Sequence, residues 1–253
     1  MWILGATFCL CCQASPCLGF SRFLELGFNA FVVWYRVHLF EGVDPLPHTE
    51  DNWYKASGSH RFPMPQQDAA ACVAYVRAHA DEWNTNPSQI AIMGFSAGGH
   101  LAASLSGLWH HADLWTEMGL TPEDVRPNAA VLSYPVIVAD HDAHRGSFEH
   151  LSGGDKNVEN HQQYSILNWV TENYPPTFLW HTFTDGSVPV QNSIRMGLAL
   201  ANAGVLTEMH VFPNGRHGLS LANTMTCAQA DTSLQVDECT QWPALAARFL
   251  KRL

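Results

Sequence analysis

The sequence predicts an α/β fold built on a mostly parallel central sheet of about six strands flanked by helices. Short apolar runs recur along the chain, and most are continuous, which is typical of strands buried on both faces of a parallel sheet. Stretches with apolar residues at helical spacing separate these runs. This alternation indicates parallel strands joined by crossover helices.

Six segments carry the strand pattern and four carry the helix pattern. The expected strands are Ile3–Cys12, Asn29–Val37, Gln89–Met93, Ala129–Tyr134, Thr177–Thr182 and Thr207–Phe212. The expected helices run from Asp68 to about Glu82, from Ala97 to about Trp109, from Val190 to Ala203, and from Pro243 into the last residues. Asp68 suits an N-cap, Gly204 suits a helix stop and Pro243 suits a first turn.

Two long polar stretches interrupt this alternation. Residues 38–66 are rich in Pro, Gly, His and Asp, and we expect a long loop there. Residues 140–170 are rich in His, Asp and Gly, and we expect an insertion with short helices. Loops of this length usually shape a binding site. Because no internal repeat or Gly/Ser linker is visible, we predict a single domain over residues 1–253.

Composition excludes several classes of protein. The chain has 13 Lys and Arg against 23 Asp and Glu, a formal net charge of −10, and no basic cluster that would neutralise phosphates. We therefore expect no nucleic-acid partner. No apolar run reaches about 18 residues, so we expect no membrane span. A hydrophobic content of 47% is too high for a disordered chain.

Four of the seven cysteines crowd the start of the chain, at Cys9, Cys11, Cys12 and Cys17. Their spacing lacks the paired C-x2-C arrangement of zinc sites, so we interpret them as small side chains of a buried strand and expect no metal. The apolar start resembles a secretion signal, but no Lys or Arg precedes Arg22. This favours a cytoplasmic location and leaves secretion open.

The strongest motif is Gly94-Phe95-Ser96-Ala97-Gly98, directly after an expected strand. Gly-x-Ser-x-Gly between a strand and a helix is typical of a nucleophile elbow, a tight turn that lifts a serine hydroxyl above the sheet. Ser96 is then the candidate nucleophile, and the backbone N–H of Ala97 is a candidate donor to an oxyanion. The alternative is a glycine-rich turn that only packs a helix on a sheet.

A serine nucleophile needs a histidine base and an acid that orients the base. In this type of fold both follow the serine in the chain, at the ends of later strands. Asp185 and His217 meet that requirement among 14 histidines and many carboxylates; the alternative is a turn carboxylate and a solvated loop histidine. His181 lies within a strand and is expected to be structural. His100 either lines the pocket or packs against the sheet.

These stretches together resemble the α/β-hydrolase serine esterases, in particular the acetyl-xylan/feruloyl esterase-like and carboxylesterase-type enzymes. The resemblance is carried by Gly27–Val37, Pro63–Glu82, Gln89–Trp109, Pro175–Asn192 and Glu208–Ala222. It implies the α/β-hydrolase fold, a carboxylic ester hydrolase without cofactor, and the roles of nucleophile, acid and base for Ser96, Asp185 and His217.

The expected function is that of a serine esterase that hydrolyses short acyl esters through an acyl-enzyme intermediate. Acetyl groups on xylan-type carbohydrate are the substrate that the resemblance implies, so the expected partner is a small-molecule or carbohydrate ester. Two alternatives remain open. One is a catalytically weak or silent ligand-binding protein, and the other is a serine peptidase of the prolyl-oligopeptidase type.

The sequence departs from the family near its start. Members carry a glycine-rich turn that supplies a second oxyanion donor, whereas Gln13–Gly19 contains no glycine triplet. The family's first strands are also expected to be missing. Loss of one oxyanion donor lowers the rate by about 10²–10³-fold, so a weak esterase is expected.

Overall fold

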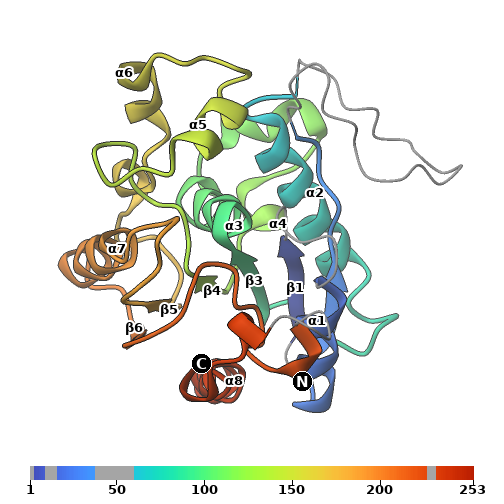
Figure 1. Ribbon diagram of the computed structural model, residues 1–253. Helices are drawn as coiled ribbons and strands as arrows, with labels where there is room; N and C mark the ends of the chain where they lie inside the picture. Colours follow the sequence, from blue (N-terminus) through green and yellow to red (C-terminus); the bar gives the residue numbers. More distant parts are fainter. Residues whose placement is uncertain (1–2, 9–15, 38–59, 227–231) are drawn as a thin grey trace, which may run out of the picture.

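A computed structural model describes residues 3–8, 16–37, 60–226 and 232–253 (Figure 1). Within these residues, six strands form one sheet in the order β2-β1-β3-β4-β5-β6, and every neighbouring pair is parallel. The strands are β1 (Ile3–Phe8), β2 (Asn29–Val32), β3 (Ile90–Phe95), β4 (Ala129–Ser133), β5 (Thr177–Thr182) and β6 (Thr207–Phe212). The predicted parallel sheet of about six strands is confirmed.

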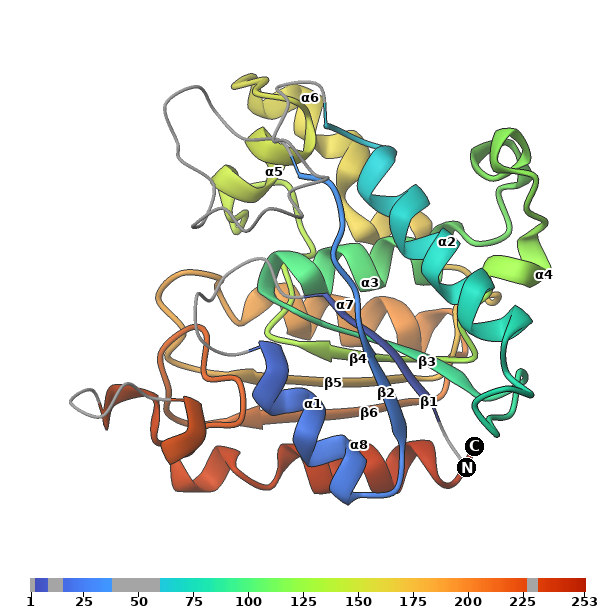
Figure 2. The same ribbon diagram turned by 90° about the vertical axis from the view of Figure 1, so that its right-hand side faces the viewer.

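Helices cover both faces of the sheet. The longer ones are α1 (Pro16–Glu25), α2 (Met64–Ala78), α3 (Ser96–Leu108), α7 (Gln191–Asn202) and α8 (Trp242–Leu250). Figure 2 shows α1 and α8 on one face and α2, α3 and α7 on the other. Across the described parts of the chain, no helix combines the length and apolar character needed to span a membrane.

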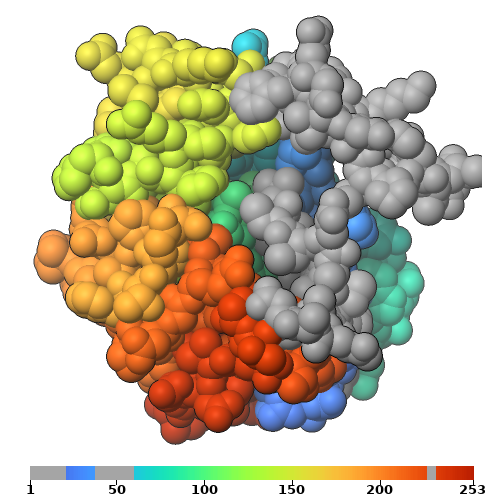
Figure 3. All heavy atoms as spheres, in the orientation of Figure 1, coloured from blue at the N-terminus to red at the C-terminus, as the bar shows by residue number. Residues whose placement is uncertain are grey.

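Shorter helical elements fill the connections. They are α4 (Pro122–Val125), α5 (Arg145–Leu151), α6 (Val158–His161), and the 3-10 turns η1 (Ala112–Leu114), η2 (Thr116–Met118), η3 (Gln162–Tyr164), η4 (Ile166–Trp169), η5 (Thr224–Thr226), η6 (Thr232–Leu234) and η7 (Asp237–Cys239). Residues 140–170 thus hold short helices, as expected for an insertion. Figure 3 shows them as a yellow-green lobe beside the orange region that includes α7.

Strand β3 explains why the apolar runs are continuous. Ile90 and Ile92 pack with α2, α3 and α7, whereas Ala91 and Met93 pack with α1 and α8. All four side chains are at most 1% exposed. Because helices cover both faces of the strand, neither face requires polar residues.

The predicted start of α2 at Asp68 is wrong, because the helix begins at Met64. The Asp68 carboxylate does not cap the helix; it accepts hydrogen bonds from the backbone N–H and the guanidinium of Arg36 at 2.7–3.1 Å. Strand β2 is also shorter than predicted, since it ends at Val32 and not at Val37. Beyond that strand, the backbone N–H of Arg36 bonds this carboxylate and no neighbouring strand.

The first part of the chain differs from the prediction in one respect. Helix α1 is not predicted, because the cysteines before and within it continue the apolar run of the first strand. Strand β1 ends at Phe8, and the rest of the predicted strand, up to Cys12, lies outside the described residues. Most of the predicted loop 38–66 also lies outside them, and residues 64–66 belong to α2.

Candidate active site

Ser96 stands at the junction between β3 and α3, directly after the last residue of the strand. Its backbone φ is +54°, in the left-handed region that residues with a Cβ atom seldom occupy. Strain of this kind persists only where the surrounding structure imposes it, and it concentrates at functional sites. The junction therefore has the geometry of a nucleophile elbow.

Two glycines make this turn possible. A Cβ atom on Gly94 would lie 2.0 Å from the carbonyl oxygen of Gly98, which is far inside contact distance. A Cβ atom on Gly99 would lie 2.8 Å from the Cβ atom of Pro135 in the loop after β4. The start of α3 thus packs so closely on its neighbours that only glycine fits at these positions.

The three predicted catalytic side chains lie together. The Nε2 atom of His217 is 2.7 Å from the Oγ atom of Ser96, and its Nδ1 atom is 2.6 Å from Oδ2 of Asp185. Asp185 follows β5 and His217 follows β6, so the carboxyl ends of parallel strands bring them to the edge where β3 presents Ser96. Residues far apart in the chain become neighbours for this reason.

Hydrogen bonds keep Asp185 charged although its side chain is only 1% exposed. Its Oδ1 atom accepts the backbone N–H groups of Ser187 at 2.9 Å and Val188 at 3.0 Å. Burial raises the pKa of Asp185, but hydrogen bonds from His181 and His217 hold that pKa well below its usual range. A carboxylate only accepts, so Nδ1 of His217 donates to it, and the Nε2 atom of a neutral ring then accepts the Ser96 hydroxyl proton.

Ala97 occupies the first turn of α3, where backbone N–H groups have no carbonyl partner within the helix. It is placed to donate to an oxyanion, and this role stays a prediction. A second donor is expected from Gln13–Gly19, the stretch that corresponds to the family's glycine-rich turn. Residues 13–15 lie outside the described residues, and Pro16–Gly19 form the first turn of α1.

His100 packs in the interior one turn after Ser96. Its Nδ1 atom is 3.1 Å from the carbonyl oxygen of Val136, and its ring meets the ring of Phe148 edge-on at 5.3 Å. Burial lowers the pKa of His100 to about 4, so the ring is neutral at pH 7. Of the two alternatives for this residue, the structure favours packing.

Two other histidines lie closer to the site than their sequence positions indicated. His181 is completely buried, and its Nε2 atom is 3.3 Å from Oδ2 of Asp185. His144 precedes α5 and is half-buried; burial first, and then the charge of His217, lower the pKa of His144. His144 is thus close enough to His217 for the two rings to interact through charge. The sequence feature that could have indicated this contact is the position of His181 four residues before Asp185.

A cluster of Asp140, His141 and Asp142 resembles a metal site, since one ligand-type atom from each lies within 4.8 Å of the others. Arg195 Nη2 is 2.7 Å from Asp140, and its Nη1 atom is 3.4 Å from Asp142. Because a guanidinium already pairs with both carboxylates and the His141 side chain is 83% exposed, we assign no metal to the cluster.

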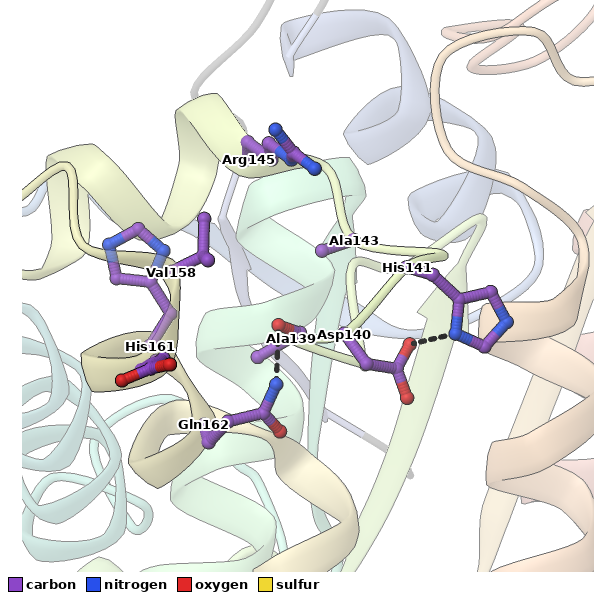
Figure 4. Close-up of a pocket in the computed structure, with 9 residues that line it drawn as sticks. Ala139, Asp140, His141, Ala143, Arg145, Val158, His161 and Gln162 are labelled. Atoms are coloured by element: carbon purple, nitrogen blue, oxygen red, sulfur yellow. Dashed lines mark hydrogen bonds and ion pairs between the residues drawn. The ribbon is translucent and has the colours of Figure 1, made fainter.

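A cavity of about 410 Å³ lies beside this cluster, within the insertion (Figure 4). It is lined by Ala139, Asp140, His141, Ala143, Arg145, Val158, Glu159, His161 and Gln162. Figure 4 shows Gln162 reaching across to Ala139, whose carbonyl oxygen accepts a hydrogen bond from its Nε2 atom at 2.9 Å. None of the three catalytic candidates lines this cavity.

A parallel α/β sheet with a serine at a strained strand–helix turn, and a histidine and an aspartate after later strands, defines an α/β hydrolase. The chain belongs to the BD-FAE family, whose profile matches residues 52–200. The predicted resemblance to acetyl-xylan esterase-like α/β hydrolases is thereby confirmed.

Two curated relatives are similar over most of this chain. Endo-1,4-beta-xylanase B of Butyrivibrio fibrisolvens is 33% identical over 223 residues, which are 87% of this chain and 32% of the relative. The acetylxylan esterase of Xylanibacter ruminicola is 36% identical over 197 residues, which are 76% and 34% of the two chains. This chain therefore spans about a third of the length of the curated relatives it matches.

Solved structures match nearly the whole of this chain and most of their own length. The acetyl ester-xyloside bifunctional hydrolase of Caldicellulosiruptor lactoaceticus has a TM-score of 0.73 and 32% identity, covering 99% of this chain and 84% of its own. The carboxylesterase Cest-2923 of Lactobacillus plantarum has a TM-score of 0.77 and 25% identity, covering 99% and 86%. The predicted class, a carboxylic ester hydrolase, agrees with the names of these proteins.

Proposed function

We propose that the protein is a serine esterase that hydrolyses short acyl esters through an acyl-enzyme intermediate. The observation that carries the proposal is the continuous pair of contacts from Ser96 to His217 at 2.7 Å and from His217 to Asp185 at 2.6 Å. A serine hydroxyl becomes a useful nucleophile when a base takes its proton and an acid holds that base in the right tautomer.

In the first half of the reaction, Ser96 Oγ attacks the ester carbonyl carbon while Nε2 of His217 takes the hydroxyl proton. The backbone N–H of Ala97 donates to the oxyanion that forms. The carbon–oxygen bond to the alcohol then breaks, and His217 returns its proton to the departing alkoxide oxygen. The acyl group remains on Ser96.

In the second half, His217 takes a proton from a water molecule, whose oxygen attacks the acyl carbon. Collapse of the tetrahedral intermediate breaks the bond to Ser96, His217 returns the proton to Oγ, and the carboxylic acid leaves. Asp185 keeps the Nδ1–H of His217 directed towards itself throughout, so that Nε2 faces the reacting atoms. Each step therefore balances without a further reactant.

Acetyl groups on xylan-type carbohydrate are the proposed substrate. Support comes from the names of two similar proteins, an acetylxylan esterase and an acetyl ester-xyloside bifunctional hydrolase. Fold alone does not fix a substrate, so this part of the proposal depends on the similarity and needs its own assay.

The test compares the unaltered protein with Ser96→Ala on p-nitrophenyl acetate and on acetylated xylan. We expect a burst of p-nitrophenol and release of acetate from the unaltered protein, and the loss of both in Ser96→Ala. The exposed Ser88→Ala variant is the matched control and keeps full activity. Hydrolysis retained in Ser96→Ala, or no burst above that variant in the unaltered protein, contradicts the proposal.

A further inference from the structure

A second histidine contacts the carboxylate oxygen that binds His217. Oδ2 of Asp185 lies 2.6 Å from Nδ1 of His217 and 3.3 Å from Nε2 of His181. The His181 side chain is 0% exposed, and that of Asp185 is 1% exposed. An electrostatic contact between groups buried this deeply is stronger than the same contact in water.

The partners of His181 identify which of its ring nitrogens carries the proton. Nε2 also lies 3.0 Å from the carbonyl oxygen of Val188, which can only accept a hydrogen bond. Nε2 therefore carries the proton and donates it to Val188, and the same N–H group lies 3.3 Å from Oδ2 of Asp185. Nδ1 lies 2.7 Å from Oγ of Ser193 on α7 and accepts its hydroxyl proton when the ring is neutral. Both nitrogens thus have partners.

These partners come from three different parts of the fold. His181 is the fifth residue of β5, Val188 and Asp185 belong to the loop that follows, and Ser193 lies in the first turn of α7. The imidazole therefore ties the loop that carries Asp185 to the strand before it and to the helix after it. A carboxylate held by donors on both oxygens cannot rotate without breaking at least one of these bonds.

We propose that His181 is a positioning residue of the catalytic triad, which holds the Asp185 carboxylate in the orientation that receives the Nδ1–H of His217. This inference rests on the proposed function for its kinetic consequences. Its N–H also shares the negative charge of Oδ2, so that less of that charge is available to His217.

Loss of the His181 N–H changes two measurable properties. A carboxylate that turns by a fraction of an ångström misplaces His217 relative to Ser96, and misplacement of about 1 Å lowers the rate by about 10²-fold. The freed charge on Oδ2 favours the protonated form of His217, which is inactive as a base. The acidic limb of the pH–rate profile then moves to higher pH. Two further titratable side chains interact with His217. The Tyr134 ring packs edge-on against its ring with 5.0 Å between centroids, and His144 interacts with it through charge. Neither is altered in the variants.

The experiment uses His181→Phe, which keeps a ring but loses both nitrogens, and His181→Gln, whose amide replaces the Nε2–H. Ser193→Ala is the control, because it removes the partner of Nδ1 and leaves the Asp185 contact in place. Circular dichroism establishes that each variant folds. The far-downfield proton resonance of the His217–Asp185 hydrogen bond, assigned by its loss in Asp185→Ala, gives a readout that does not depend on turnover.

We expect His181→Phe to lower kcat by about 10–100-fold with KM within about twofold, because the change acts on the reacting geometry. Its acidic limb moves to higher pH and its downfield resonance shifts, whereas His181→Gln and Ser193→Ala stay close to the unaltered protein. Unchanged kcat in His181→Phe overturns the inference. An equally lowered kcat in His181→Phe and His181→Gln, with an unchanged downfield resonance, also overturns the inference, because it indicates that His181 acts by packing alone.

If His181→Phe fails to fold, His181→Leu, which likewise has no N–H donor, takes its place. A kcat lowered about 10–100-fold in His181→Leu, with near-normal kcat in His181→Gln, supports the inference, and equal kcat in the two variants overturns it. If the unaltered protein shows no hydrolysis that depends on Ser96, the esterase proposal fails. The resonance still reports whether His181 holds Asp185, so the two failures are distinguishable.

Discussion

The surroundings of Asp185 determine its charge state. Burial opposes its charge, yet interactions with His181, His217 and the backbone N–H of Val188 hold its pKa below the usual range. At pH 7 it is therefore a carboxylate that accepts the proton-bearing nitrogen of His217. An amide at the same position presents an N–H to His217 in one of its two orientations and stabilises the wrong tautomer.

We therefore expect Asp185→Asn to lower kcat for p-nitrophenyl acetate by about 10³–10⁴-fold with little change in KM. The exposed Asp81→Asn variant is the matched control and keeps normal kinetics. Steady-state kinetics at pH 7 provide the measurement. Activity within tenfold of the unaltered protein means that Asp185 does not orient the base.

His100 makes stability depend on pH. Its pKa is about 4 in the folded chain and 6.5 ordinarily, so the unfolded chain binds the proton more tightly between these values. The contribution of the neutral His100 ring to the free energy of unfolding is complete above pH 6.5, and it is lost as the pH falls towards 4. From pH 7 to pH 5 the free energy of unfolding drops by about 2 kcal/mol on this account. Urea unfolding at both values tests this, and His100→Gln removes the drop. Equal drops in both proteins contradict the assignment.

The turn between β3 and α3 is an element in which glycine is a geometric requirement. Gly94 meets the backbone of Gly98, so an added methyl group collides with main-chain atoms that cannot swing aside. Gly186, beside Asp185, has no atom within 4 Å of the position of an added Cβ. The two glycines therefore form a matched pair for testing the turn.

We expect Gly94→Ala to displace Ser96 and to lower kcat by at least about 10²-fold, together with a loss of thermal stability. Gly186→Ala is expected to keep both properties close to normal, because its methyl group meets nothing. Melting temperature and esterase kinetics are measured for each variant. A Gly94→Ala variant with normal kinetics shows that the packing at this turn does not hold the serine.

Helix α7 organises the chain that follows β4 through one buried side chain. Oδ1 of Asn192 accepts the backbone N–H groups of Ile137 and Val138 at 2.8 and 3.0 Å, and Asn192 is 0% exposed. Arg195 on the same helix binds Asp140 from a side chain that is 34% exposed. The buried contact therefore matters more than the partly solvated ion pair.

Asn192→Ala leaves two buried N–H groups without their acceptor and is expected to lower the free energy of unfolding by about 2–4 kcal/mol. Arg195→Ala is expected to lower it by no more than about 1 kcal/mol, because water screens that ion pair. Chemical denaturation of the two variants gives the comparison. A larger effect for Arg195→Ala reverses this order and contradicts the explanation.

The two layers of helices share one sheet, which bears on the prediction of a single domain. Apolar side chains of β3 and β4 enter the clusters on both faces of the sheet. Loss of either layer exposes the same strands, so we expect unfolding to be one cooperative transition over residues 1–253. Tryptophan fluorescence and far-ultraviolet circular dichroism should give the same midpoint in urea. Two separate transitions contradict a single domain.

Local pattern was sufficient for much of the architecture. Strands β5 and β6 both have the predicted bounds. In β5 every residue is buried, as expected for an apolar run covered on both faces. β6 is an edge strand in which Met209 and Val211 are exposed. The elbow motif and chain order singled out Ser96, Asp185 and His217, and the structure brings these three residues together. The order of strands and helices constrains where strand ends meet, so residues placed there can be chosen from the sequence.

Contacts between distant residues decided the rest. Asp68 has the pattern of a helix cap, yet the helix begins at Met64 and the Asp68 carboxylate binds Arg36, 32 residues earlier in the chain. His181 has the pattern of an ordinary strand residue, yet the turn after β5 brings Asp185 back against its ring. A side chain takes the partner that folding supplies, and no local pattern records which partner that is. The sequence by itself therefore determines the secondary structure, through short-range preferences, and the order in which the triad residues occur. The orientation of the triad carboxylate follows from tertiary packing.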